Sequence, residues 1–235
     1  MNREMVFAKA MNRTGDRSVF KAGWSQVAAL MSLVVLLVAA QALHAATDVK
    51  DDSALKPPPG WRIAIVEFDD LQCPACSQTN PLLMAAVAQY KIPWVRHFLL
   101  IPMHNWSRNA AINAMWFEQQ KKGLGNEYEN QVFANQSSIY NPLMLRQFTE
   151  KFAQEHGIQM PFDMDPQGKL ANAVEADNQL SRRTGINQTP TIFVVTEDKG
   201  GKHYVEVTDH SKLYQTIDAA LASLKRQGLS EKMGK

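Results

Sequence analysis

The sequence predicts an α/β fold in which helices cover a β-sheet and a helical segment is inserted between two of its strands. One observation is a nearly continuous apolar run at 62–68 that leads directly into a helical pattern. Such a run is typical of a strand covered on both faces. The other is the stretch 103–186, whose apolar residues recur mostly at helical spacing. Because long structureless loops are uncommon in compact domains, we expect a helical insertion packed against the sheet.

Strands and helices of the central domain follow from the apolar patterns. The predicted strands are 62–68, 94–101, 191–196 and 204–207. The last two form a hairpin because a glycine-containing turn separates them. A helix runs from the cysteine pair to Tyr90 and is expected to kink at Pro81. An amphipathic helix at 212–226 ends the domain.

Four segments of the insertion have apolar residues at helical spacing. They are 109–122, 127–135, 143–156 and 169–184. Gly157 and Gly185 follow the last two segments directly, where a glycine commonly caps a helix. We therefore place the domain at 61–228, after a polar linker at 47–60 and before a tail at 229–235.

The first 46 residues are predicted to direct export. They carry five basic and two acidic residues, then an apolar core at 27–40 that runs into the small residues Ala40-Gln41-Ala42. This pattern is typical of a signal peptide and its cleavage site. The alternative is an uncleaved membrane anchor built from residues 24–46, although the apolar core alone is short for a span. Both readings place the rest of the chain in the periplasm or another extracytoplasmic compartment, where disulfides persist.

Composition and charge exclude some functions. Hydrophobic residues make up 45% of the chain and charged residues 20%, as in an ordinary globular protein. The formal net charge is +2, and the predicted leader alone accounts for more than this excess. The exported part therefore has no basic patch with which to bind nucleic acid. No phosphate-binding glycine loop occurs in the sequence.

The chain has only two cysteines, Cys73 and Cys76, separated by Pro74 and Ala75 at the start of a predicted helix. Free N–H groups and the positive dipole end at a helix N-terminus favour a thiolate there. Since a thiolate attacks disulfides, we interpret Cys73 as the nucleophile and Cys76 as the resolving partner. The alternatives are a static disulfide, which would constrain little chain, and half of a metal site, which lacks further ligands at suitable spacing.

Glu67 interrupts the apolar pattern of the first strand. Strand alternation places it on the same face as Ile63 and Ile65, six residues before Cys73. Partial desolvation there should raise the pKa of its carboxyl group, so that it can pass a proton to or from Cys76. The alternative is a glutamate at a strand end that reaches solvent.

The order of these motifs resembles the thioredoxin superfamily, and within it the DsbA-like thiol–disulfide oxidoreductases. Phe68 lies five residues before Cys73, Pro81 lies five residues after Cys76, and Thr189-Pro190 precedes the third strand. The resemblance implies a thioredoxin-like fold, with a central mixed β-sheet flanked by helices and an inserted α-helical subdomain. It covers nearly all of the part predicted to be exported.

The resemblance also implies roles for single residues. Glu67 stands where the superfamily carries a buried acid, and Pro190 stands where it carries a cis-proline facing the cysteine pair. Thr189 and Pro190 would then line a groove in which the backbone of Thr189 binds an extended substrate strand. Ala75 stands where strongly oxidising members carry His, which argues for a weaker oxidant.

We therefore expect an exported protein thiol–disulfide oxidoreductase whose active site is Cys73-Pro74-Ala75-Cys76. Its substrates would be protein or peptide thiols and disulfides, and a membrane partner would reset its redox state. We expect a monomer that needs no cofactor and no metal. One alternative is a disulfide reductase or isomerase kept reduced by a membrane partner. The other is a non-enzymatic peptide-binding module with a static disulfide.

Overall fold

The computed structural model describes residues 46–197 and 203–228. The predicted signal peptide or anchor lies outside the described residues except for Ala46, as do most of the predicted hairpin turn and the tail from 229 onward. Within the described ranges, no helix is both long enough and apolar enough to cross a membrane.

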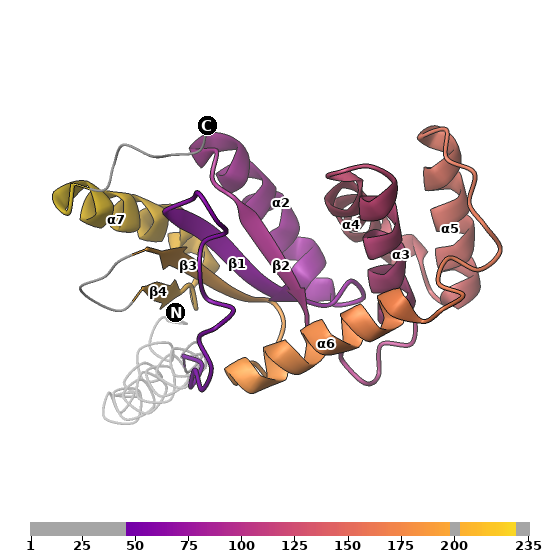
Figure 1. Cartoon of the computed structure of the whole chain (residues 1–235), viewed down its shortest axis with the longest axis horizontal. Helices are drawn as coiled ribbons and strands as arrows, with labels where there is room; N and C mark the ends of the chain where they lie inside the picture. The colour runs from indigo at the N-terminus through magenta and orange to yellow at the C-terminus, as the bar shows by residue number, and fades with distance from the viewer. Residues whose placement is uncertain (1–45, 198–202, 229–235) are drawn as a thin grey trace, which may run out of the picture. The chain divides into compact units, whose positions relative to one another are not determined.

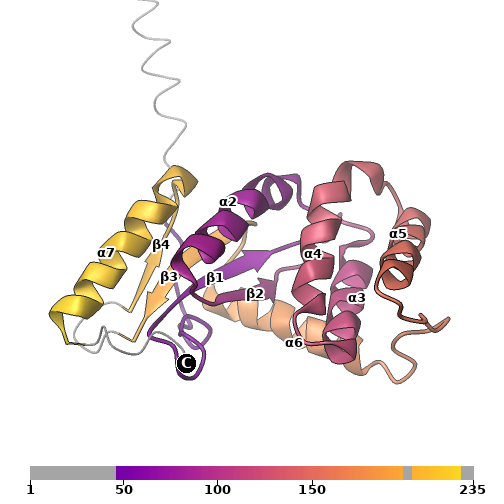
Figure 2. The same ribbon diagram turned by 90° about the horizontal axis from the view of Figure 1, so that it is seen from above.

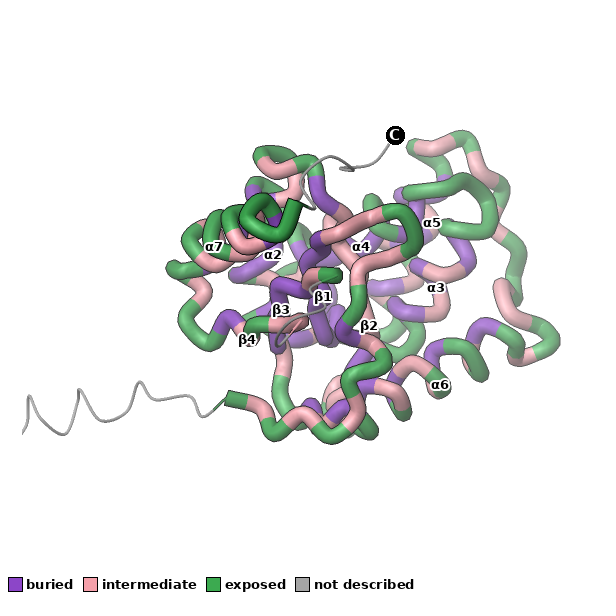
Figure 3. Tube along the Cα trace, turned by 60° about the vertical axis from the view of Figure 1, so that its left-hand side comes forward, coloured by how far each residue is buried: buried purple, intermediate pink, exposed green. Residues whose placement is uncertain are grey.

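A four-stranded mixed sheet forms the centre of the domain, with the strand order β2-β1-β3-β4 (Figure 1). The strands are β1 (Ile63–Asp69), β2 (Trp94–Phe98), β3 (Thr191–Thr196) and β4 (Tyr204–Glu206). β1 pairs in parallel with β2 and antiparallel with β3, which in turn pairs antiparallel with β4. The predicted mixed sheet is confirmed, and the central position of β1 explains why its whole length is buried (Figure 3).

β1 contributes its alternating side chains to two apolar cores. The helices that cover one face of the sheet are α2 (Pro74–Tyr90) and α7 (Leu213–Arg226) (Figure 2). Ile63 and Ile65 pack against these helices. Ala64 and Val66 point to the opposite face, where they pack with Leu55. Burial of such side chains stabilises the fold by about 1.5–3 kcal/mol for each large aliphatic group.

The chain between β2 and β3 forms the predicted helical insertion. Its elements are α3 (Ser107–Gln120), α4 (Leu124–Asn135), the short 3-10 helix η2 (Gln136–Ser138), α5 (Pro142–Glu155) and α6 (Lys169–Thr184). The rings of Phe117, Tyr128 and Phe152 lie 4.8 to 5.2 Å apart between their centroids and form an aromatic core. α6 packs beside β2 and α3 and returns the chain to β3 (Figure 1).

β2 ends at Phe98, whereas the sequence predicted a strand that continues to Ile101. The Leu99 N–H still donates to the Asp69 carbonyl at 2.8 Å, but beyond Leu99 the backbone N–H groups bind side chains. The Leu100 N–H donates to Asn178 Oδ1 at 3.0 Å, and the Ile101 N–H donates to Asp70 Oδ2 at 2.8 Å. The apolar run therefore continues past the point where strand pairing stops.

Residues 47–60 were expected to form a polar linker, but they pack onto the domain. Leu55 is fully buried in the core on the second face of the sheet. The Lys50 N–H donates to the Thr184 carbonyl at 3.0 Å, and the Thr47 hydroxyl donates to Glu206 at 2.9 Å. One buried leucine and these hydrogen bonds fix a segment whose composition is otherwise polar.

Gly185 allows this segment to approach the end of α6. It has φ +93°, and an added Cβ would collide with the backbone oxygen of Asp48. We expect Gly185→Ala to lower the free energy of unfolding by about 2–3 kcal/mol, because left-handed strain adds to the collision. Gly157→Ala is the matched control, since φ is +67° there and an added Cβ would meet no atom of another part of the chain within 4 Å. Equal losses in urea unfolding of the two variants would contradict the role of the close approach.

Candidate active site

The cysteine pair lies at the N-terminus of α2. Cys73 is the N-cap residue and Pro74 is the first helical residue. Both cysteines are free thiols. Cys73 retains 8% of its exposure, whereas Cys76 has none. A partner sulfur can therefore approach Cys73 but not Cys76.

The two thiols are in opposite electrostatic environments. The pKa of Cys73 is lowered to about 5, chiefly by a hydrogen bond from the Cys76 thiol, with further hydrogen bonds from Thr189 and from the backbone N–H groups of Cys76 and Ala75. Burial raises the pKa of Cys76 well above its ordinary value, and its hydrogen bond to Cys73 and nearby carboxylates add to the effect. The pair thus consists of an acidic thiol beside a buried one that keeps its proton.

The loop before β3 borders Cys73. β3 pairs antiparallel with β1 and begins opposite Phe68, which brings the preceding residues to the end of β1 where α2 starts. The Thr189–Pro190 peptide bond is cis. The carbonyl oxygen of Thr189 lies 3.5 Å from Cys73 Sγ. Residues 116 positions apart in the sequence therefore meet at the nucleophile.

Glu67 lies in the middle of β1 and is buried, with 1% exposure. Its carboxylate accepts a hydrogen bond from Trp94 Nε1 at 3.0 Å, and Arg96 Nε lies 3.7 Å from Oε2. Burial raises the pKa of Glu67 to about 7, although Arg96 and Trp94 oppose the shift. The structure therefore gives Glu67 the desolvated setting predicted from strand alternation, on the face covered by α2.

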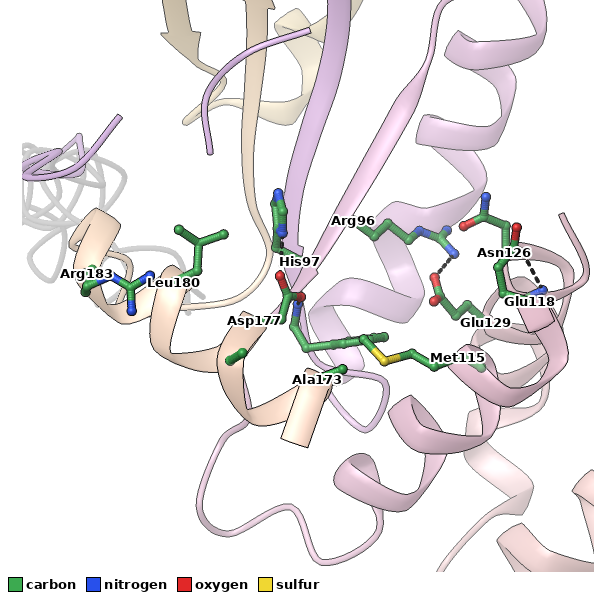
Figure 4. Close-up of a pocket in the computed structure, with 14 residues that line it drawn as sticks. Arg96, His97, Met115, Glu118, Asn126, Glu129, Ala173, Asp177, Leu180 and Arg183 are labelled. Atoms are coloured by element: carbon green, nitrogen blue, oxygen red, sulfur yellow. Dashed lines mark hydrogen bonds and ion pairs between the residues drawn. The ribbon is translucent and has the colours of Figure 1, made fainter. Parts of the chain in front are cut away.

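Sequence reasoning missed Asp69, Arg96 and Glu129, which lie beside Glu67. Arg96 Nη1 donates to Glu129 Oε2 at 2.6 Å (Figure 4). The guanidinium carbon of Arg96 also lies 3.6 Å from the centroid of the Trp94 ring. The sequence could have identified Asp69, because this second acid follows Glu67 by two residues and so lies on the same face of β1. No sequence signal identifies Arg96, because the register of β2 against β1 is a tertiary property.

The turn before α2 is held by side chains from several elements. Asp70 accepts from the Gln72 N–H at 2.8 Å through Oδ1, and His104 Nδ1 lies 2.9 Å from the same oxygen. Gln136 Nε2 donates to the Leu71 carbonyl at 2.9 Å and to the Cys73 carbonyl at 3.1 Å. These bonds fix the backbone on the N-terminal side of the nucleophile.

A hollow of about 540 Å³ lies next to Pro74, between α2 and the insertion. Trp106, Phe133, Gln136 and Tyr140 are among its lining residues. Tyr140 is 72% exposed, so the rim presents an aromatic ring to an approaching chain. Within residues 46–197 and 203–228, no group of three or more His, Cys, Asp or Glu side chains is arranged to hold a metal ion.

Several solved structures share this fold. Wolbachia pipientis alpha-DsbA1 is 17% identical with a TM-score of 0.54, over 78% of this chain and 98% of that one. Proteus mirabilis ScsC is 14% identical with a TM-score of 0.55, over 88% and 95%. A periplasmic thioredoxin-like protein from Salmonella enterica serovar Typhimurium is 19% identical with a TM-score of 0.55, over 71% and 88%. No curated protein matches the sequence.

A mixed sheet with a helical insertion and a dithiol at the start of α2 together define a thiol–disulfide oxidoreductase of the thioredoxin type. The profile of a thioredoxin family matches residues 62–219, which is more than half of the chain. The chain belongs to this thioredoxin family, as its motifs predicted, and it shares the fold of the solved DsbA structure.

Proposed function

We propose that this protein is an exported oxidoreductase that donates disulfides to protein or peptide thiols. The observation that carries the proposal is the unequal setting of its two sulfurs at the α2 N-terminus. Cys73 is the sulfur within reach and has a pKa of about 5, whereas Cys76 is fully buried with a raised pKa. At neutral pH, Cys73 is therefore a thiolate and Cys76 a thiol. A stabilised thiolate favours the reduced form, which makes the oxidised form a disulfide donor.

In the proposed reaction, a substrate thiolate attacks Cys73 Sγ of the oxidised protein and the Cys73–Cys76 bond breaks. Cys76 leaves as a thiolate and takes up a proton, for which Glu67 is the predicted donor. A second substrate thiolate then attacks the substrate sulfur of the mixed disulfide, and Cys73 leaves as its stable thiolate. The substrate gains a disulfide, and the protein is reduced by two electrons.

Thr189 and Pro190 are proposed to shape the substrate groove. The Thr189 carbonyl oxygen lies 3.5 Å from Cys73 Sγ. Because the Cys73 thiolate has no proton to donate, this oxygen can accept an N–H from an extended substrate strand. Pro74 and Ala75 complete the active-site motif between the two cysteines. No step of this exchange calls on a cofactor or a metal.

The pKa of Cys73 supports a donor of intermediate strength. A pKa of about 5 lies between the values of about 7 for thioredoxin and about 3.5 for DsbA. The side chain of Ala75 supplies no hydrogen bond to the thiolate, in line with a weaker oxidant than the members that carry His there. The alternative function of the same dithiol is that of a disulfide isomerase or reductase.

Export, location and partners belong to the same proposal. Residues 1–46 would serve as a signal peptide or anchor, residues 61–228 as the oxidoreductase domain and residues 229–235 as a tail. The periplasmic thioredoxin-like protein from Salmonella, which shares this fold, supports an extracytoplasmic setting. We further propose a monomer that is returned to its oxidised state by a membrane redox partner.

The proposal is tested by the redox equilibrium of the protein from Thr47 onward in glutathione buffers, with thiol trapping. We expect a reduction potential between about −180 and −120 mV and a Cys73 thiolate absorbance that titrates near pH 5. A potential of about −250 mV or lower would indicate a reductant instead. A bond that resists reduction below about −300 mV would mean a structural disulfide and would contradict the enzymatic proposal.

A further inference from the structure

Three buried carboxyl groups surround one guanidinium on the face of the sheet below α2. The acid cluster consists of Glu67, Asp69, Glu129 and Arg96. Arg96 Nη1 lies 2.6 Å from Glu129 Oε2, and Arg96 Nε lies 3.7 Å from Glu67 Oε2 and 3.9 Å from Asp69 Oδ2. None of the four side chains is more than 8% exposed.

The strand register explains why these groups meet below the cysteines. Glu67 pairs with Arg96 across β1 and β2, and Asp69 follows on the same face two residues later. Asn80 of α2 accepts from Arg96 Nη2 at 2.6 Å, which ties the guanidinium to the helix that begins with the dithiol. Asp69 is the last residue of β1 and stands four residues before Cys73.

One positive charge cannot balance three buried carboxylates, and unpaired buried charge is costly, so the acid cluster must hold protons at neutral pH. Glu129 makes the short hydrogen bond to Arg96 and is best suited to stay ionised. Glu67 has one oxygen bonded to Trp94 and one without a partner. Neither oxygen of Asp69 has a hydrogen-bond partner in the described structure, which makes Asp69 the preferred place for a proton.

We propose that Asp69 holds a proton at neutral pH and gives it to Cys76 when the disulfide opens, sharing this task with Glu67. Arg96 is the positioning residue, because it keeps Glu129 ionised and leaves the other two acids to share the proton. This inference deepens the proposed function and rests on it. In the reverse direction, Asp69 as a carboxylate takes the proton from the Cys76 thiol, which then attacks Cys73 Sγ of the mixed disulfide and releases the substrate thiolate.

Charged groups reach this site from every element around it. β1 carries Glu67 and Asp69, and the turn after it carries Asp70. Arg96 comes from β2 and Glu129 from α4, and the two cysteines lie at the start of α2. Burial raises the pKa of Asp69 well above its ordinary value, and the charge of Glu67 adds to the shift. Among the carboxylates that raise the pKa of Cys76, Asp69 acts more strongly than Glu67. The electrostatics therefore agree with the geometry.

The acid cluster also borders a cavity whose lining does not include Cys73, the residue that the substrate would cover. Arg96 and Glu129 line this cavity of about 550 Å³ between β2 and the helices α3, α4 and α6 (Figure 4). Asp177 on α6 lines it too, and its carboxylate binds His97 at 2.6 Å and the Phe98 N–H. Protons can therefore return to the acid cluster through this cavity while a substrate covers Cys73.

The decisive measurement follows the Cys76 side chain by NMR in full-length Cys73→Ser protein carrying ¹³C-labelled cysteine, across a pH titration. We expect Asp69→Asn to lower the titration midpoint of Cys76 by about one unit or more, since it removes a coupled negative charge. Asp177→Asn is the matched control, because Asp177 is a carboxylate beside β2 that is not among the groups that raise the pKa of Cys76. A shift in Asp69→Asn no larger than in Asp177→Asn would overturn the proposal.

Kinetics separate the roles of the two acids. With both cysteines present, we expect Asp69→Asn to slow the opening of the disulfide by dithiothreitol at pH 7 by about tenfold or more. When the rate is expressed per dithiothreitol thiolate, whose concentration itself rises with pH, Glu67→Gln alone should retain a pH-dependent rate, and only the double variant should lose it. Loss of the whole pH dependence in Glu67→Gln would assign the proton to Glu67 alone and overturn the role of Asp69.

A measurement on the unmutated protein guards against variants that do not fold. The carboxyl carbon of Asp69, labelled with ¹³C, should report a protonated group at pH 6, and an ionised group there would overturn the proposal. These readouts do not depend on catalysis. An inactive wild-type protein would therefore contradict the proposed oxidoreductase function without deciding whether Asp69 holds the proton.

Discussion

Cys73→Ser is expected to lose at least about a thousandfold of the exchange rate with a peptide disulfide or dithiol, because the nucleophile of a catalytic unit is removed. Serine cannot form the thiolate that attacks sulfur, and Cys76 has no exposure through which to replace Cys73. The measurement is the rate of disulfide formation in a reduced model peptide. Retention of full activity in Cys73→Ser would contradict the assignment of the active site.

Cys76→Ser is the informative companion, because it keeps Cys73 but removes the resolving thiol. It should still attack a substrate disulfide and then accumulate a mixed disulfide, visible as a covalent adduct on non-reducing gels. Cys73 also loses its largest stabilising hydrogen bond, so its pKa should rise above about 5. The absence of any adduct in this variant, together with peptide binding that survives loss of both cysteines, would favour a binding module.

Arg96→Met is expected to cost about 3–5 kcal/mol of unfolding free energy at pH 8, because it leaves buried carboxylates without their cation. The lost hydrogen-bond partners are Glu129 at 2.6 Å, Asn80 at 2.6 Å and Asn130 at 2.7 Å, besides the two acids of β1. The control is Arg62→Met, which breaks a partly exposed ion pair with Glu197 at 3.8 Å and should cost less than about 1 kcal/mol. Urea unfolding of both variants measures the difference.

The cost of Arg96→Met should depend on pH. The pKa of Glu67 is raised in the folded protein from 4.5 to about 7, so between these values the folded state binds more protons than the unfolded chain. Unfolding free energy therefore falls as pH rises from about 4.5 to about 7, even in the unmutated protein. Without Arg96 the carboxyl pKa values rise further, and the fall should be steeper. A loss that is equal at pH 5 and pH 8 would contradict this account.

The sequence alone sufficed for the elements that depend on local patterns. The apolar run of β1 and the helical spacing of the insertion predicted their elements to within a few residues. Pro74 and the helix N-terminus located the dithiol, and alternation along β1 placed Glu67 on the face covered by α2. Each of these inferences needs only the spacing of residues within one element.

Features that depend on tertiary contacts were not predictable. Arg96 lies in a strand of intermediate exposure, and only the parallel register with β1 brings it to Glu67. The segment before Gly60 looks polar, and its one buried residue, Leu55, carries no periodic signal. β2 was predicted too long because an apolar run does not reveal where its N–H groups turn to Asp70 and Asn178.

The amide of Gln136 has a consequence for how substrates are accommodated. It binds the carbonyls on both sides of the turn before Pro74, and the Ser77 hydroxyl donates to the Phe133 carbonyl at 2.8 Å. The insertion is thus hydrogen-bonded directly to the backbone that carries the nucleophile. Such preorganisation spares the ordering cost of closing a lid on binding. Differences between substrates must then be met by rotations of exposed rim side chains such as Tyr140, while Cys73 keeps its place.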